Sequence, residues 1–148
     1  MNARINHLAV WILVIVDQGI GGLWYRVFNE MWIGYHGKLM TDIDQEGGGF
    51  APFVVSIVAG AAINYALAWL IRRLNIQSAG GGLRKALICW VAFFLMPYAT
   101  IEAFSAFGRN PSQIVLINAC YWLIVFALSG AVLAAWEENG GIATHRFE

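Results

Sequence analysis

The sequence predicts an all-α integral membrane protein, a bundle of four transmembrane helices with the N-terminus and the C-terminus in the cytoplasm. Of the 148 residues, 59% are hydrophobic and only 12% are charged, whereas ordinary soluble domains have about 25% charged residues. The apolar residues also gather into four runs of about 20 residues, the length that a helix needs to cross a bilayer. We therefore expect one membrane domain that fills the chain.

The four spans follow one another with distinct connections. The first, approximately residues 7–25, begins like a signal peptide, but no small-x-small cleavage site follows it, so we expect it to be retained. The connections are an outer loop at 26–50, a basic cytoplasmic loop at 72–84 and a cytoplasmic tail at 137–148. The remaining spans are approximately residues 51–71, 85–104 and 112–136.

The distribution of basic residues predicts the orientation. The loop after the second span is the most basic, with Arg72, Arg73 and Arg84 followed by Lys85. Since loops rich in lysine and arginine stay in the cytoplasm, four crossings place both termini there as well. This arrangement puts six basic residues inside and three outside.

Aromatic residues predict where the helices meet the membrane interfaces, because amphipathic rings are favoured there. Trp24 and Tyr25 are expected as anchors at the outer interface, and Trp69 and Trp136 at the inner one. The spacing of the aromatic residues after the first span is helical, so that helix is expected to continue to about Trp32 and to break near Gly34. The aromatic face of this extension would pack on the outer loop or on a partner.

An aspartate, Asp17, lies near the middle of the first span. A carboxylate at this depth costs about 2.5–3.5 kcal/mol on insertion scales, so it should face the bundle and not lipid. Counting residues places Asn64 of the second span at nearly the same depth, and Asn118 of the fourth span about a turn further out. We expect these three to form an intramembrane polar network, with Asp17 neutral and hydrogen-bonded to Asn64. The role of the acid could be structural, fixing helix pairing, or functional, as a proton or cation site.

Small residues accompany the polar ones at helical spacing. Gly21 lies four residues after Asp17, and Gly60 and Ala68 flank Asn64 by four residues on either side. Small side chains let helix backbones approach closely in membranes. We expect Gly21, Gly60 and Ala68 to form the helix-packing seam beside the Asp17–Asn64 pair.

A second acid, Glu102, lies near the outer end of the third span, five residues after Pro97. The proline removes a backbone donor and is expected to bend that helix. Glu102 would be solvated at the interface, in a pair with Arg109, or would line a pathway.

The chain lacks the patterns of a catalytic, metal or cofactor site. No histidine lies in the interior of a predicted span, since His7 is at the inner edge of the first one, and there is no G-x-S-x-G, H-E-x-x-H, P-loop or C-x-x-C. We therefore expect no catalytic residues, no metal and no cofactor, and a protein that is not an enzyme. The nine acidic residues balance the nine basic ones, which argues against nucleic acid as a partner.

Two stretches resemble a known family. "GGLWYRVFNEMW" (Gly21 to Trp32) is similar to the G-x-x-W-Y-S-x-x-x-F-G-x-x-W stretch of the small bacterial membrane proteins grouped as domain of unknown function 1761, and "YWLIVFALSGAVLAAW" (Tyr121 to Trp136) resembles the final span of that family. Arg26 stands where the family tends to have serine, and Asn29-Glu30 where it tends to have glycine-lysine. The resemblance implies four spans and a place in the bacterial inner membrane. It implies no activity.

Two functions remain open. The first is a structural or accessory subunit that packs in a homo-oligomer or against other membrane protein subunits, with the lipid bilayer as its surroundings. The second is a small proton- or cation-coupled carrier or channel that works as an oligomer, with Asp17 as the coupling acid. Four spans are too few for the usual repeat-built transporter, but a dimer could enclose a site near the midplane.

Overall fold

A computed structural model describes residues 5–38, 49–105 and 110–138. Every regular element within these residues is a helix, and together they make four helices that are long and apolar enough to cross a membrane. The all-α, four-span class predicted from the sequence is confirmed. The elements are α1 (His7–Tyr35), α3 (Ala51–Arg73), α4 (Ala79–Cys89), the π-helix η1 (Trp90–Leu95), α5 (Met96–Phe104) and α6 (Pro111–Glu138).

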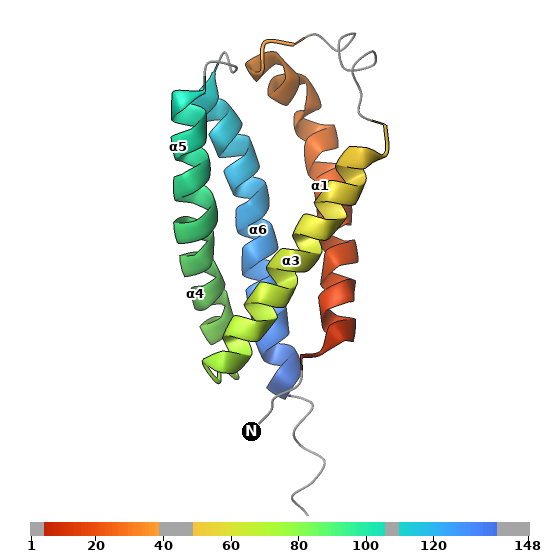
Figure 1. Ribbon diagram of the computed structural model, residues 1–148, viewed down its shortest axis with the longest axis vertical. Coiled ribbons are helices and arrows are strands. Elements are labelled where there is room, and N and C mark those ends of the chain that lie inside the picture. Colours follow the sequence, from red (N-terminus) through yellow and green to blue (C-terminus); the bar gives the residue numbers. More distant parts are fainter. Residues whose placement is uncertain (1–4, 39–48, 106–109, 139–148) are drawn as a thin grey trace, which may run out of the picture.

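The helices run up and down, and α6 is the central one, since it contacts each of the other elements. The start of α1, the end of α6 and the short α3–α4 connection lie at the same end of the bundle (Figure 1), which we call the closed end. The end of α1, the start of α3 and the α5–α6 connection lie at the opposite end, which we call the open end. This placement matches the four crossings predicted from the sequence.

The first helix is longer than a bilayer requires. The side chain of Asn6 caps its start by accepting a hydrogen bond from the Ala9 amide at 3.1 Å, as short polar residues do at helix starts. The helix ends at Tyr35, and Gly37 follows with a φ of 72°, a left-handed conformation that glycine adopts at no steric cost. The predicted continuation of the helix beyond residue 25 is thus confirmed, with its end three residues after Trp32.

The basic loop at 72–84 is shorter than the sequence predicted. α3 continues to Arg73 and α4 begins at Ala79, so only five residues connect them. Asn75, with a φ of 52°, ends the turn of α3, and the Ser78 hydroxyl caps α4 by accepting from the Gly81 amide at 3.2 Å. The glycines after Ser78 fall within the predicted loop, but they belong to a helix that packs tightly.

That tight packing is the crossing of α4 and α6. A methyl group on Gly82 would overlap the Gly130 carbonyl oxygen and the Ala134 side chain, and one on Gly130 would overlap Ala86. Each helix therefore presents two small residues four positions apart, the spacing that allows close approach in membranes. Gly82 and Ala86 are missing from the packing seam predicted from the sequence.

The third span contains a π-helical segment, η1, directly before Pro97. The Met96 amide donates to the Val91 carbonyl, five residues back. Pro97 has no amide hydrogen and its ring crowds the carbonyl four residues earlier, and a widened turn accommodates both effects. The expected disturbance at Pro97 is thus a π-helix.

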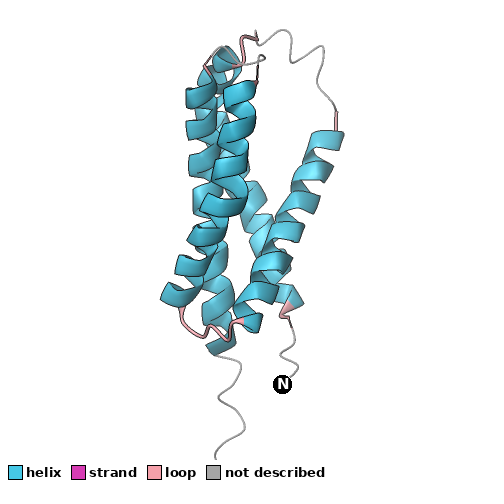
Figure 2. Cartoon of the chain, turned by 60° about the vertical axis from the view of Figure 1, so that its left-hand side comes forward, coloured by secondary structure: helices cyan, strands magenta, loops and turns pink. Residues whose placement is uncertain are grey.

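The apolar core lies in the closed half of the bundle. Its fully buried members come from α1, α3, α4 and α6 and contact one another: Ala9, Val10, Leu13, Leu67, Ala68, Ile71, Ala86, Phe126, Leu133 and Ala134. Towards the open end, α3 leans away from the other helices (Figure 2). Residues 51–55 of α3 are accordingly all exposed.

Candidate functional site

The Asp17 and Asn64 side chains meet between α1 and α3. The Asn64 amide nitrogen donates to Asp17 Oδ2 at 2.7 Å and to the Gly60 carbonyl oxygen at 3.0 Å. Asp17 is 1% exposed and Asn64 0%, so the contact is shielded from lipid. Counting along the two helices was sufficient to pair these residues, because each adds about 1.5 Å of depth per residue.

The pair keeps two oxygens without a partner. Asp17 Oδ1 and Asn64 Oδ1 are buried, and no donor among the described residues reaches either. Two unsatisfied acceptors side by side are costly in an apolar interior. A proton on the Asp17 carboxyl would turn one acceptor into a donor, so a neutral acid fits this site better than a carboxylate.

Tyr121 of α6 covers the pair on the side of the open end. Its hydroxyl donates to the Asp17 carbonyl oxygen at 3.2 Å. A methyl group on Gly21 would lie 3.0 Å from that hydroxyl oxygen, so Gly21 leaves room for Tyr121. The sequence placed Gly21 in a seam with α3, but the structure places it against α6. Gly60 and Ala68 do lie on the buried side of α3, where Ala68 belongs to the apolar core.

Asn118 does not join the Asp17–Asn64 pair, which corrects the predicted three-residue network. Its side chain accepts from the Tyr25 hydroxyl at 2.7 Å and donates to the Tyr98 hydroxyl oxygen at 2.6 Å. Glu102, one turn beyond Tyr98, lies near enough to interact electrostatically with the same hydroxyl. Depth alone could not show that Asn118 faces α1 and α5 and not α3.

The polar groups therefore form two layers. The deeper layer is Asp17 with Asn64, and the second layer is Tyr25, Asn118, Tyr98 and Glu102. The layers meet where the rings of Tyr25 and Tyr121 lie with centroids 5.5 Å apart. Sequence reasoning missed Tyr98 and Tyr121, although a tyrosine inside a span needs a partner for its hydroxyl, which is a usable signal. Arg109, the expected partner of Glu102, lies outside the described residues.

Of the four predicted interface anchors, two bond within the bundle and two are exposed. Trp24 and Tyr25 turn inwards, since the Trp24 indole donates to the Ile117 carbonyl oxygen at 3.1 Å and Tyr25 bonds Asn118. These two residues hold α1 to α6 and are not free anchors. Trp69 is 60% exposed and Trp136 39%, as expected for rings that face the surroundings.

A cleft of about 690 Å³ opens beside the polar layers, where α3 leans away from α1 and α6. Two polar side chains meet on its wall: the Ser56 hydroxyl donates to Gln18 Oε1 at 3.0 Å. Its volume lies in the range of about 300–1,000 Å³ that ligand sites occupy. The lining residues come from three helices: Gln18, Gly21, Gly22, Tyr25, Pro52, Phe53, Val55, Ser56, Ala59, Tyr121 and Trp122.

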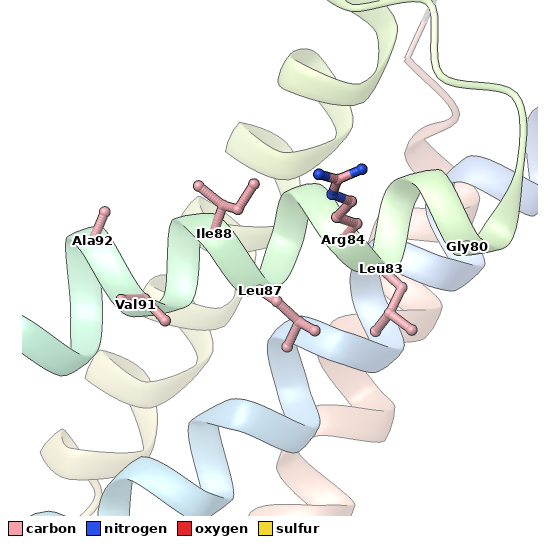
Figure 3. Close-up of a pocket in the computed structure, with 7 residues that line it drawn as sticks. All are labelled: Gly80, Leu83, Arg84, Leu87, Ile88, Val91 and Ala92. Atoms are coloured by element: carbon pink, nitrogen blue, oxygen red, sulfur yellow. The ribbon is translucent and has the colours of Figure 1, made fainter.

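A second hollow, of about 610 Å³, lies on the surface of the third span. Figure 3 shows its lining residues, which run from Gly80 to Ala92 along α4 and the start of η1. Because all of its lining residues belong to the third span, this hollow is a depression on the surface of that span. It offers Arg84 as its one charged lining group and no convergent polar set.

Comparison with known proteins assigns a family and no activity. Residues 8–134 match the family described as "Protein of unknown function (DUF1761)". Neither the curated proteins nor the solved structures contain a match. The match covers all four membrane-spanning helices and both polar layers.

Proposed function

Because the chain belongs to the DUF1761 family, whose members share no established activity, we propose its function from its own geometry: a non-catalytic accessory subunit of the bacterial inner membrane. In this role α1 packs against a second copy or against another membrane protein. Both termini are in the cytoplasm, and the open end faces outwards. The proposal includes the absence of catalysis, which the scattered Asp, Glu and Cys residues support.

One observation carries the proposal. Gly19 lies in the middle of the outward face of α1, and a methyl group there would meet nothing within 4 Å in the described structure. A glycine inside a helix costs roughly 0.5–1 kcal/mol relative to alanine, and no packing within the described part of the chain requires it. The neighbours of Gly19 on this face are large, exposed apolar residues, Ile15 at 70% and Leu23 at 68%. A second helix that crosses at Gly19 would account for the glycine.

The outward face of α1 continues beyond the apolar part. Arg26 and Glu30 are exposed and lie on the same side of the helix as Gly19, at seven and eleven residues. A partner helix that covered this face would pack at Gly19 within the membrane and would contact Arg26 and Glu30 near the membrane edge. A helix face that contacts only lipid requires neither the small-residue crossing nor the charged residues.

The test uses two matched substitutions on one helix. Gly19→Leu should abolish the assembly that is captured by cross-linking in native membranes and sized in mild detergent, because the side chain blocks the crossing. Gly22→Leu, one turn further and turned towards the cleft, should leave the assembly intact. A chain that is monomeric in the membrane, or an assembly that Gly19→Leu does not change, would contradict the proposal.

A specific observation favours a second candidate, a proton- or cation-coupled carrier with Asp17 as its coupling acid. The layer of Tyr25, Asn118, Tyr98 and Glu102 leads from the open end towards Tyr121, which bonds the Asp17 backbone. On the other side of Asp17, in the closed half, the buried Ser129 hydroxyl has no hydrogen-bond partner among the described residues, and the Tyr65 hydroxyl pairs with His7 at 3.0 Å, so neither continues the polar layers. A carrier needs access from both sides, so the accessory role is the better supported one. Flux in proteoliposomes that Asp17→Asn abolishes would reverse this preference.

A further inference from the structure

The cleft between α1, α3 and α6 is bounded by helices that lie at membrane depth. It runs along α1 from Gln18 to Tyr25 and along α3 from Pro52 to Ala59. Water is scarce at this depth, so a molecule of the bilayer is the available occupant for this mostly apolar cleft. The chemistry of the lining residues determines which membrane molecule can bind.

Among the polar groups on the cleft wall, the Gln18 side chain holds a donor that has no acceptor in the described part of the chain. Gln18 uses its oxygen to accept from Ser56, while no acceptor within the described part of the chain reaches its amide nitrogen. The hydroxyls of Tyr25 and Tyr121 also line the cleft and retain lone pairs. An unpaired amide donor in an apolar site costs about 1–3 kcal/mol, and a ligand that brings a carbonyl oxygen would remove that cost.

The other walls are aromatic and neutral. Rings from three helices surround the space, and none of the described lining residues carries a charge: Tyr25, Phe53, Tyr121 and Trp122 supply the rings. Flat rings pack well between aromatic side chains. A charged headgroup would find no counter-charge on these walls.

The depth of Gln18 distinguishes between two kinds of membrane molecule that carry a carbonyl group. Gln18 follows His7, the first residue of α1, by eleven positions, which places it about 16 Å along a hydrocarbon core of about 30 Å. The ester carbonyls of a diacyl lipid lie at the edge of that core and not in its middle. A ring that carries carbonyl groups on an apolar tail can reach this depth.

We propose that this cleft is a binding site for an uncharged, lipid-soluble ring compound with carbonyl acceptors, the chemistry of a membrane quinone. The Gln18 amide donates to a ring carbonyl, and the aromatic side chains hold the ring. The proposal concerns binding, and it requires no electron transfer by this chain. It is independent of the proposed accessory role, which uses the outward face of α1.

The experiment uses the full chain in lipid nanodiscs and two pairs of variants. Gly22→Leu places a side chain in the cleft from a position where an added Cβ meets nothing within 4 Å, and Gly19→Leu adds the same side chain to the same helix outside the cleft. Gln18→Leu removes the donor, and Gln113→Leu repeats that change at an exposed position outside the cleft. Binding of a short-chain quinone is followed by quenching of tryptophan fluorescence, and the lipids that co-purify with the chain are extracted and identified.

The expected result is saturable quenching and a co-purified quinone. Gly22→Leu and Gln18→Leu should each weaken binding at least tenfold, while Gly19→Leu and Gln113→Leu should stay within twofold of the unsubstituted chain. A co-purified diacyl lipid without quinone, no saturable binding, or equal loss in both members of a pair would overturn the proposal. A melting curve for each variant separates loss of binding from loss of fold. The two proposals are tested separately, because Gly19→Leu can lose the assembly and still bind the quinone.

Discussion

Replacing Asp17 tests whether the buried acid holds α1 to α3. In Asp17→Leu, Asn64 keeps its bond to the Gly60 carbonyl oxygen but loses its acceptor on α1. Leaving a buried donor without its partner costs about 1–3 kcal/mol. The Asp17 backbone carbonyl remains available to the Tyr121 hydroxyl, so the contact between α1 and α6 should survive.

A conservative variant and a double variant isolate the bond itself. Asp17→Asn should change the free energy of unfolding by less than about 1 kcal/mol, because an amide at position 17 can accept from Asn64 and donate to its unpaired Oδ1. Combining Asp17→Leu with Asn64→Leu removes both polar groups and should cost less than the sum of the single changes. The expected coupling energy is about 0.6 kcal/mol and at most about 1.7 kcal/mol, the average and the maximum found for hydrogen bonds between membrane helices.

The assay is reversible unfolding of the purified chain in bilayer-like discs or mixed micelles, with all four variants measured together. A coupling energy indistinguishable from zero would refute the structural role of the bond. An Asp17→Asn variant as unstable as Asp17→Leu would show that position 17 needs the acid itself. That outcome would indicate that Asp17 acts through its charge or its proton and not through helix pairing.

Two further predictions concern packing and orientation. Gly82→Ala should destabilise the bundle by about 1–3 kcal/mol in the same unfolding assay, because the added methyl overlaps α6 and forces the helices apart. Gly80→Ala, where a methyl meets nothing within 4 Å, should be neutral or stabilising, and equal effects at the two positions would contradict the close crossing. A cysteine introduced in place of Asp44 should react with an impermeant reagent on intact cells, and one in place of Ala79 should not. The reverse pattern would invert the proposed orientation.

The amino-acid sequence alone predicts the fold class, the approximate spans and the depth of each polar residue. Depth in a membrane helix is proportional to residue number, at about 1.5 Å per residue. For that reason the contact between Asp17 and Asn64 could be predicted by counting. The continuation of α1 beyond Tyr25 was predictable as well, since helical spacing of aromatic residues is a local property.

The direction in which each side chain faces around the bundle required the folded structure. Asn118 has a suitable depth to meet Asn64, yet it bonds Tyr25 and Tyr98 because of the way α6 is rotated against α1 and α5. The glycines after Ser78 fell within the predicted loop, and their role in a helix follows from the contact of Gly82 with Gly130 of α6.

The lean of α3 is the clearest case of a feature that local sequence does not determine. Residues 51–59 are as apolar as the rest of that span, so nothing in their composition predicts a cleft beside them. The angle of α3 follows from the sum of its contacts with α1 and α6, and its buried residues lie in the closed half with the apolar core, whereas residues 51–55 at its start are exposed. Helix crossing angles depend on which side chains interlock across two surfaces. That pairing is a property of the assembled bundle and not of any one segment.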